Sequence, residues 1–216
     1  MGAMKPGLVL TDRRTGLPSV RFAGAPLLRP RYLLRHTFSG AGLTPSDQGP
    51  SLSVESGTAN ISGGVVAPSS ATALAISNYA SVAVNAVWEA RFNFGNSAGT
   101  ARNFYMRIRQ NGNDSVWVRH DRTNDRIRID RIDNSVVTQV GVKNAAGLAD
   151  STWYVTRVIA QGDSYRVLFG PDTGALSEII AATFSGFSTN GGLGVILADN
   201  VASPTLQLDR YEVWTP

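Results

Sequence analysis

The chain alternates apolar and polar residues in short runs, and this period of two is its main structural signal. The clearest case is residues 103–133, NFYMRIRQNGNDSVWVRHDRTNDRIRIDRID. Alternation puts Phe104, Met106 and Ile108 on one side of a strand, because successive side chains point to opposite faces. Two further runs repeat the pattern, around Val116–Val118 and Ile127–Ile129. Three adjacent strands are therefore predicted, with aliphatic residues inward and arginines and aromatic residues outward.

Similar runs recur from residue 37 onward and predict an all-β fold of two antiparallel sheets. The expected strands are residues 51–55, 58–66, 82–94, 103–110, 115–120, 126–132, 136–141, 152–161, 164–170, 176–184, 192–198 and 205–214. Turn signals lie at 111–114, 133–135, 161–163 and 190–192. The step from Ile129 to Ile132 breaks the alternation and indicates a β-bulge at Asp130–Arg131. No window keeps a helical period for more than about two turns.

Residues 1–36 differ from the rest and predict an extended arm ahead of a domain at 37–216. Prolines at 6, 18, 26 and 30 interrupt any helix or central strand, and only short apolar pieces lie between them. The arm has seven basic residues and one acidic residue, 7 − 1 = +6, whereas the remainder has 13 − 15 = −2. The positive charge of the chain therefore belongs to the arm.

Composition excludes several classes of protein. The 216 residues include no cysteine, so disulfides and thiolate metal sites are ruled out. Only two histidines are present, which argues against a multi-histidine zinc site. No apolar run reaches the roughly 18 residues of a membrane span. The start, MGAMKPGLVL, lacks the apolar core of a signal peptide, so none is expected.

The segments HTFSGAGLTPSDQGPSLSVESGTANISGGVV, VWEARFNFG and LQLDRYEVW resemble strands of concanavalin A-like lectin and glucanase domains of the LamG type. The resemblance covers residues 37–216 and implies a jelly-roll sandwich. Domains of this kind, preceded by a short arm, occur in bacteriophage tail and capsid-surface proteins. The resemblance therefore suggests a virion surface location and a homo-oligomeric assembly.

The outward face of the three strands is the candidate binding site. Aromatic rings stack on sugar faces, and arginines grip carboxylate, sulfate or phosphate groups. The candidate carbohydrate-binding residues are Tyr105, Arg107, Trp117, Arg119, His120 and Arg128, with Arg109 and Arg126 on the same expected face. The alternative is a solvated face whose arginines pair with the interleaved aspartates, and the nearly balanced charge favours that alternative.

The sequence offers no catalytic motif and no assigned cofactor. A glucanase of this fold carries E-x-D-x-x-E, whereas the body has only Glu55, Glu89, Glu178 and Glu212, which are not so spaced. A polysaccharide-degrading glycoside hydrolase is thus the least favoured alternative. Relatives of this fold bind Ca²⁺, and Asp209 lies where a ligand could sit, but one carboxylate does not make a site, so calcium is left open.

The arm alternates arginines with apolar groups, which favours docking on a protein partner over binding nucleic acid. The candidate docking residues are Arg13, Arg14, Arg21, Phe22, Arg29, Arg31 and Tyr32. The hypothesis is a non-enzymatic virion surface protein that is anchored to other virion proteins by its arm and binds host-surface carbohydrate. The alternative is a purely architectural virion protein, which is anchored by the same arm but has no carbohydrate ligand.

Overall fold

The computed structural model describes residues 8–11, 18–21, 31–40, 42–43, 48–82, 85–96, 101–187 and 191–215. They form strands and turns without any helix, so no helix in this part of the chain could span a membrane. The chain divides into two compact units, Met1–Pro30 and Arg31–Pro216. In the first unit, β1 (Leu8–Thr11) pairs antiparallel with β2 (Pro18–Arg21).

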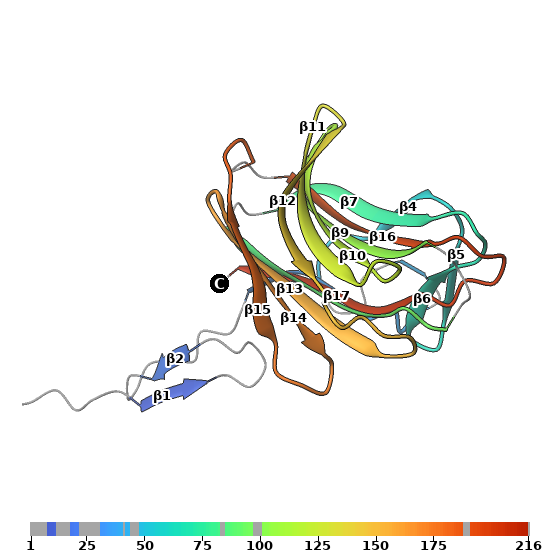
Figure 1. Cartoon of the computed structure of the whole chain (residues 1–216), viewed down its shortest axis with the longest axis horizontal. Coiled ribbons are helices and arrows are strands. Elements are labelled where there is room, and N and C mark those ends of the chain that lie inside the picture. Colours follow the sequence, from blue (N-terminus) through green and yellow to red (C-terminus); the bar gives the residue numbers. More distant parts are fainter. Residues whose placement is uncertain are drawn as a thin grey trace, which may run out of the picture. The chain divides into compact units, whose positions relative to one another are not determined.

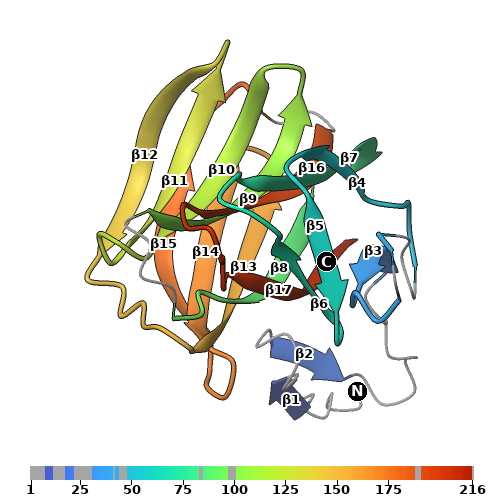
Figure 2. The same cartoon turned by 90° about the vertical axis from the view of Figure 1, so that its right-hand side faces the viewer.

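The second unit is a sandwich of two antiparallel sheets, drawn as stacked layers in Figures 1 and 2. One sheet has seven strands in the order β12-β11-β10-β9-β16-β7-β4. Their bounds are β4 Ser53–Ser56, β7 Leu74–Val82, β9 Arg102–Asn111, β10 Asp114–Asp121, β11 Arg126–Asp133, β12 Val136–Asn144 and β16 Gly191–Asp199. The all-β, two-sheet antiparallel prediction is confirmed.

The other sheet has eight strands, ordered β15-β14-β13-β8-β17-β6-β5, with β3 also paired to β17. Their bounds are β3 Arg31–His36, β5 Ala59–Ser62, β6 Val65–Pro68, β8 Ala86–Asn93, β13 Trp153–Gln161, β14 Ser164–Pro171, β15 Ser177–Thr183 and β17 Gln207–Thr215. The strand expected at 58–66 is a hairpin, β5 and β6, because Gly63 and Gly64 both take positive φ and turn the chain.

The core lies between the two sheets and follows the alternation of the sequence. Phe104, Met106 and Ile108 of β9 are fully buried. The inward residues of β10 and β11 meet them, and aromatic side chains of the eight-stranded sheet close the core from the other side, among them Trp88, Phe92 and Tyr165. This continuous apolar layer is what holds the two sheets face to face.

His120 lies inside this core, so its prediction as an outward binding residue is wrong. It shares the inward phase of Val116 and Val118 on β10, and its side chain is fully buried. Its ring centroid lies 4.9 Å from that of Phe92 and 5.7 Å from that of Phe169, both on the opposite sheet. Burial lowers the pKa of His120 to about 3, against the opposing effect of its contact with the Phe104 carbonyl.

Arg109 also turns inward, contrary to the alternation. Its backbone has a φ of 52°, which rotates the side chain out of the outer face. The guanidinium donates to the carbonyl of Gly162 at 2.6 Å, to the hydroxyl of Tyr165 at 2.6 Å and to the carbonyl of Phe187 at 2.8 Å. Because Gly162 and Tyr165 belong to the β13–β14 hairpin, Arg109 ties the two sheets together at one end.

The second unit begins six residues earlier than the predicted division between arm and domain. Arg31–His36, the last part of the expected arm, forms β3 and pairs with β17 from Arg31 opposite Thr215 to His36 opposite Tyr211. Leu34 and His36 of this strand are buried. The anchoring role of the arm stays a prediction, and any deletion that tests it should end at Pro30.

Because the folded state keeps His120 neutral, its titration should make the protein less stable in mild acid. The unfolded state takes up a proton near the ordinary pKa of about 6.5, and the folded state only near 3. Between these values the unfolded chain binds more protons, so stability falls as pH falls, by at most about 1.4 kcal/mol per pH unit. His120→Leu should therefore flatten the dependence of the urea midpoint on pH between 6.5 and 5. An unchanged slope would show that the folded protein protonates His120 as readily as the unfolded chain does, which would contradict the lowered pKa.

Loss of the Arg109 link should destabilise the sandwich strongly. Arg109→Met removes the guanidinium donor of three acceptors, of which, among the described residues, only the Phe187 carbonyl keeps another donor, the Tyr165 hydroxyl at 3.5 Å. We expect a loss of about 3 kcal/mol in the free energy of unfolding. The matched control is Arg166→Met, which removes an exposed pair with Glu178 and should cost less than about 1 kcal/mol. Equal losses in the two variants, measured by urea denaturation, would contradict the assigned role.

Candidate functional site

The outer face of the seven-stranded sheet, the side turned away from the core, gathers the predicted binding residues on three neighbouring strands. Trp117 of β10 lies opposite Arg107 of β9 and Asp130 of β11. Arg119 lies one step further along β10, opposite Tyr105 and Arg128. Directly opposed residues in antiparallel strands share a face, so five of the six candidates are neighbours, and His120 is the exception.

The arginines of the outer face are paired with carboxylates of the same sheet. Arg107 is buried and binds Glu55 of β4, which also accepts a hydrogen bond from the Ser77 hydroxyl. The Nε of Arg128 lies 2.8 Å from Asp130 Oδ2. The sequence left open whether these arginines bind a ligand or pair with acidic residues. In the structure, the guanidinium groups of Arg107 and Arg128 pair with carboxylates of their own sheet.

The next row of the face repeats the pattern. Arg119 donates to Asn103 Oδ1 at 2.9 Å, and it lies 3.5 Å from Asp121 Oδ2. Arg126 lies 3.2 Å from the same Asp121 oxygen. Burial acts to raise the pKa of Asp121, but hydrogen bonds from Asn124, the charge of Arg119 and a hydrogen bond from Arg126 outweigh it and lower the pKa. The row is therefore an ionised and internally satisfied network.

Asp130 is the opposite case. It is 1% exposed, and burial raises the pKa of its carboxyl although Arg128 and Arg119 act against the increase. Its Oδ1 has no hydrogen-bond partner among the described residues. The carboxyl supports Arg128 beneath the face and does not project as a reactive group.

Two aromatic side chains remain partly exposed between these ion pairs. The rings of Tyr105 and Trp117 meet edge to face, with centroids 5.5 Å apart and an interplanar angle of 81°. The guanidinium carbon of Arg119 lies 5.3 Å from the Tyr105 ring centroid. Such a rigid pair with an accessible edge offers an apolar surface at low entropic cost.

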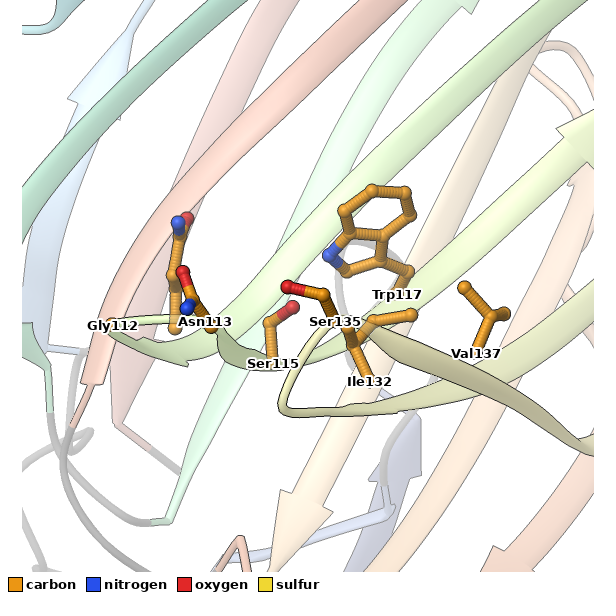
Figure 3. Close-up of a pocket in the computed structure, with 8 residues that line it drawn as sticks. Gly112, Asn113, Ser115, Trp117, Ile132, Ser135 and Val137 are labelled. Atoms are coloured by element: carbon orange, nitrogen blue, oxygen red, sulfur yellow. The ribbon is translucent and has the colours of Figure 1, made fainter.

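A pocket of about 260 Å³ adjoins Trp117 at one end of the outer face (Figure 3). Two hairpin turns enclose it. The β9–β10 turn is Gly112–Asn113, with a φ of 59° at Gly112 that suits a type II′ turn. The β11–β12 turn is Asn134–Ser135, with φ of 48° and 68°, as a type I′ turn requires. Asp114 accepts a hydrogen bond from the Asn134 amide at 2.7 Å and so fastens one turn to the other.

The pocket wall has an apolar part and a neutral polar part. Its complete lining is Gln110, Gly112, Asn113, Ser115, Trp117, Ile132, Ser135 and Val137. Figure 3 shows the indole nitrogen of Trp117 turned toward the side that holds the serine and asparagine groups. This Nε1 is buried and has no hydrogen-bond partner within the described part of the chain. The arrangement offers a ring platform, hydroxyls, amides and one free donor.

Ile132 belongs to this wall because the predicted bulge at Asp130–Arg131 is wrong. The β10–β11 register runs without a break from Ser115 opposite Ile132 to Asp121 opposite Arg126. The irregularity lies instead in β12, between the partners of Ile129 and Asp130. Ile132 therefore stays on the outer face beside Ser115, where the sequence pattern alone had suggested an inward residue.

Apart from Trp117, the pocket residues were not among the sequence candidates. The turn signals at 111–114 and 133–135 were the available clue, because they mark the two hairpins that enclose the pocket. Their proximity depends on the register of β10 with β11, which the sequence does not reveal.

The predicted docking residues of the arm are only partly described. Arg31 and Tyr32 lie in β3, and the Tyr32 ring is 5.9 Å from that of Trp214. Arg21 ends β2. The remaining candidates fall outside the described residues: Arg13, Arg14, Phe22 and Arg29.

The glutamates considered for catalysis are held in ion pairs. Glu89 binds Arg157 at 2.5 Å and Arg210 at 2.9 Å, and Glu212 binds Arg35 at 2.9 Å. The other two are paired as well, Glu55 with Arg107 and Glu178 with Arg166.

Asp209, the one carboxylate considered for calcium, pairs with Arg91. Burial raises the pKa of Asp209, although Arg91 acts to lower it. The described residues contain no group of three or more histidine, aspartate or glutamate side chains that could hold a metal ion. Calcium therefore stays unassigned.

No protein-family model matches the chain, and no curated protein matches it in sequence. Several solved structures have a similar fold. Carbohydrate-binding module CBM66 from Bacillus subtilis is 14% identical, with a TM-score of 0.56 over 76% of this chain and 91% of that one.

Two further structures cover more of the chain. The CBM2 module of the evolved Dit of Lactobacillus casei BL23 phage J-1 is 13% identical, with a TM-score of 0.62 over 86% of this chain and 95% of that one. The exoplasmic domain of VIP36 in its Ca²⁺- and mannose-bound form is 10% identical, with a TM-score of 0.67 over 87% and 92%. The chain therefore has the concanavalin A-like jelly-roll fold.

Proposed function

We propose that this protein binds carbohydrate through the outer face of its seven-stranded sheet. The observation that carries the proposal is the partly exposed Tyr105–Trp117 pair beside a pocket lined with neutral hydrogen-bonding groups. Sugars combine apolar ring faces with hydroxyls, and this surface provides both complements. The similar structures support the proposal, because two are named as carbohydrate-binding modules and a third holds mannose.

The site is proposed to bind and not to cleave. Glycoside hydrolysis uses two carboxyl groups on either side of the scissile bond. The lining of the pocket contains no carboxylate, and Asp130, which lies opposite Trp117 on the face, is buried against Arg128. The surface therefore holds a glycan without the groups that would activate water or protonate a leaving group.

We further propose that the protein is displayed on a virion, with residues 1–30 attached to other virion proteins and the jelly roll presented to the host surface. The arm combines basic and apolar residues, which suits a protein partner. One of the similar structures is a module of a phage protein, which supports this setting. Repeated copies on a virion would make the assembly symmetric.

Trp117→Ala should abolish most of the carbohydrate affinity. Removal of a stacked tryptophan costs about 2 kcal/mol or more, which is a loss of at least roughly thirtyfold in affinity. Calorimetric titration of the full chain with a panel of neutral and acidic cell-wall polysaccharides measures it. The matched control is Trp153→Ala, because Trp153 is also partly exposed but packs under Arg91 on the eight-stranded sheet. Unchanged binding in Trp117→Ala would contradict this site. If no polysaccharide gives a heat of binding, the architectural alternative is favoured.

Deletion of residues 1–30 should separate anchoring from recognition. The larger unit begins at Arg31, so the truncated protein should keep its thermal midpoint and its carbohydrate affinity. It should fail to enter assembled virions in a complementation assay. Normal incorporation of the truncated protein would contradict the anchoring role of the arm.

A further inference from the structure

We propose that the pocket between the two hairpin turns holds one uncharged sugar residue of the glycan, packed against the nitrogen-bearing edge of Trp117 and hydrogen-bonded by its indole N–H and by Ser135. This inference rests on the proposed carbohydrate binding and specifies the ligand class and the residues that select it. It departs from the sequence-based expectation of arginines that grip an acidic glycan.

The first argument for an uncharged ligand is the distribution of charge in and around the pocket. None of the eight residues that line the pocket has a charged side chain. The arginines that neighbour Trp117 on the face already have partners, because Arg107 binds Glu55. Arg119 donates to Asn103 and lies 3.5 Å from Asp121, and Arg128 binds Asp130. An acidic sugar in the pocket would lose hydration without gaining a free cation, which is unfavourable. An uncharged sugar loses only hydroxyl hydration, which the amides and hydroxyls of the wall replace.

The unpartnered indole nitrogen carries the second step. Buried donors almost always have an acceptor, and each exception calls for an explanation. Trp117 Nε1 is buried, lacks a partner among the described residues and is turned toward the polar side of the pocket (Figure 3). A hydroxyl oxygen of a sugar that lies against this edge of the indole would accept a hydrogen bond from the N–H, which points outward in the plane of the ring.

The backbone at Ser135 carries the third step. Ser135 occupies the second central position of a type I′ turn at a φ of 68°, where glycine is strongly preferred. A serine there is strained, and such strain clusters at functional sites. Its side chain lines the pocket, so the strained residue supplies a hydroxyl that glycine would not.

The size of the cavity carries the last step. A volume of about 260 Å³ falls just below the roughly 300–1,000 Å³ of pockets that hold drug-sized ligands. It therefore accommodates a single ring and not an oligosaccharide, whose remaining residues would extend over the Tyr105–Trp117 surface.

The test begins with pairs of probes that share sugars and linkages but differ in charge. Dextran and dextran sulfate form one pair, and methyl-esterified and free polygalacturonate form another, with mannan, galactan and chitin oligomers added as neutral probes. The full chain is titrated with each by calorimetry. We expect saturable binding of at least one neutral probe, with the charged member of a pair bound more weakly.

The variants separate the pocket from the rest of the face. Ser135→Gly should raise the thermal midpoint, because it relieves the strained φ, yet lower the affinity for the neutral probe about tenfold, as expected for one lost hydrogen bond. Asn134→Gly is the matched control, because it relieves the neighbouring positive φ in the same turn while Asn134 does not line the pocket. It should leave the affinity unchanged. Trp117→Phe keeps an aromatic ring but removes the N–H, and it should also lose about tenfold.

The outcomes distinguish this inference from the proposed function. The pocket is supported as the sugar subsite if Ser135→Gly raises the thermal midpoint but lowers the affinity for the neutral probe. Asn134→Gly must at the same time leave that affinity unchanged. Suppose that a probe binds and that Trp117→Ala abolishes the binding. The pocket inference is then overturned, while the binding face stands, if Ser135→Gly and Trp117→Phe bind as the wild type does. The same conclusion follows if the charged probes bind more tightly than the neutral ones. If no probe binds, both the proposed function and the inference fail.

Discussion

The alternation of side chains along β9, β10 and β11, which Arg109 alone among their arginines breaks through its positive φ, is the constraint on which both faces of the seven-stranded sheet depend. Burial of Phe104, Met106 and Ile108 commits Tyr105 and Arg107 to the other side. A shift of one residue in register would send the aliphatic residues to water and the arginines into the core. The same apolar layer that holds the sandwich together therefore creates the candidate binding face, and the two cannot be changed independently.

The charges of that face contribute structure more than recognition. Arg107, Arg128 and Arg119 are held by carboxylates from their own sheet, so the face is strongly polar but internally satisfied. Removal of one partner would leave a charge buried without compensation, which is costly. What stays available for a ligand is the aromatic pair and the neutral groups between the hairpin turns. The selectivity of the site accordingly follows from shape and hydrogen bonding.

Local patterns predicted the strands and their inward faces well, because alternation and turn residues act over a few positions. They failed where tertiary context decides. β7, LAISNYASV, was missed apart from its last residue because alanine, serine and asparagine have low strand propensity, and pairing with β16 and β4 supplies its order.

Arg109 follows the alternation in sequence, but a positive φ turns it inward. His120 was assigned to the outer face on its chemistry, although its phase on β10 already placed it with Val116 and Val118. Five of the six candidate residues were placed on the correct face, but the pocket beside them depends on a register that no local pattern encodes.

The measurement that tests the central claim most directly is a two-dimensional ¹H–¹⁵N NMR titration of the full chain with a neutral oligosaccharide. The four tryptophans give four separate indole signals that report on different places in the fold. The account predicts that the Trp117 indole N–H shifts together with backbone amides at 110–117 and 132–137, while the indoles of Trp88, Trp153 and Trp214 do not. Shifts centred on the eight-stranded sheet, or saturation that leaves the Trp117 indole unmoved, would contradict it.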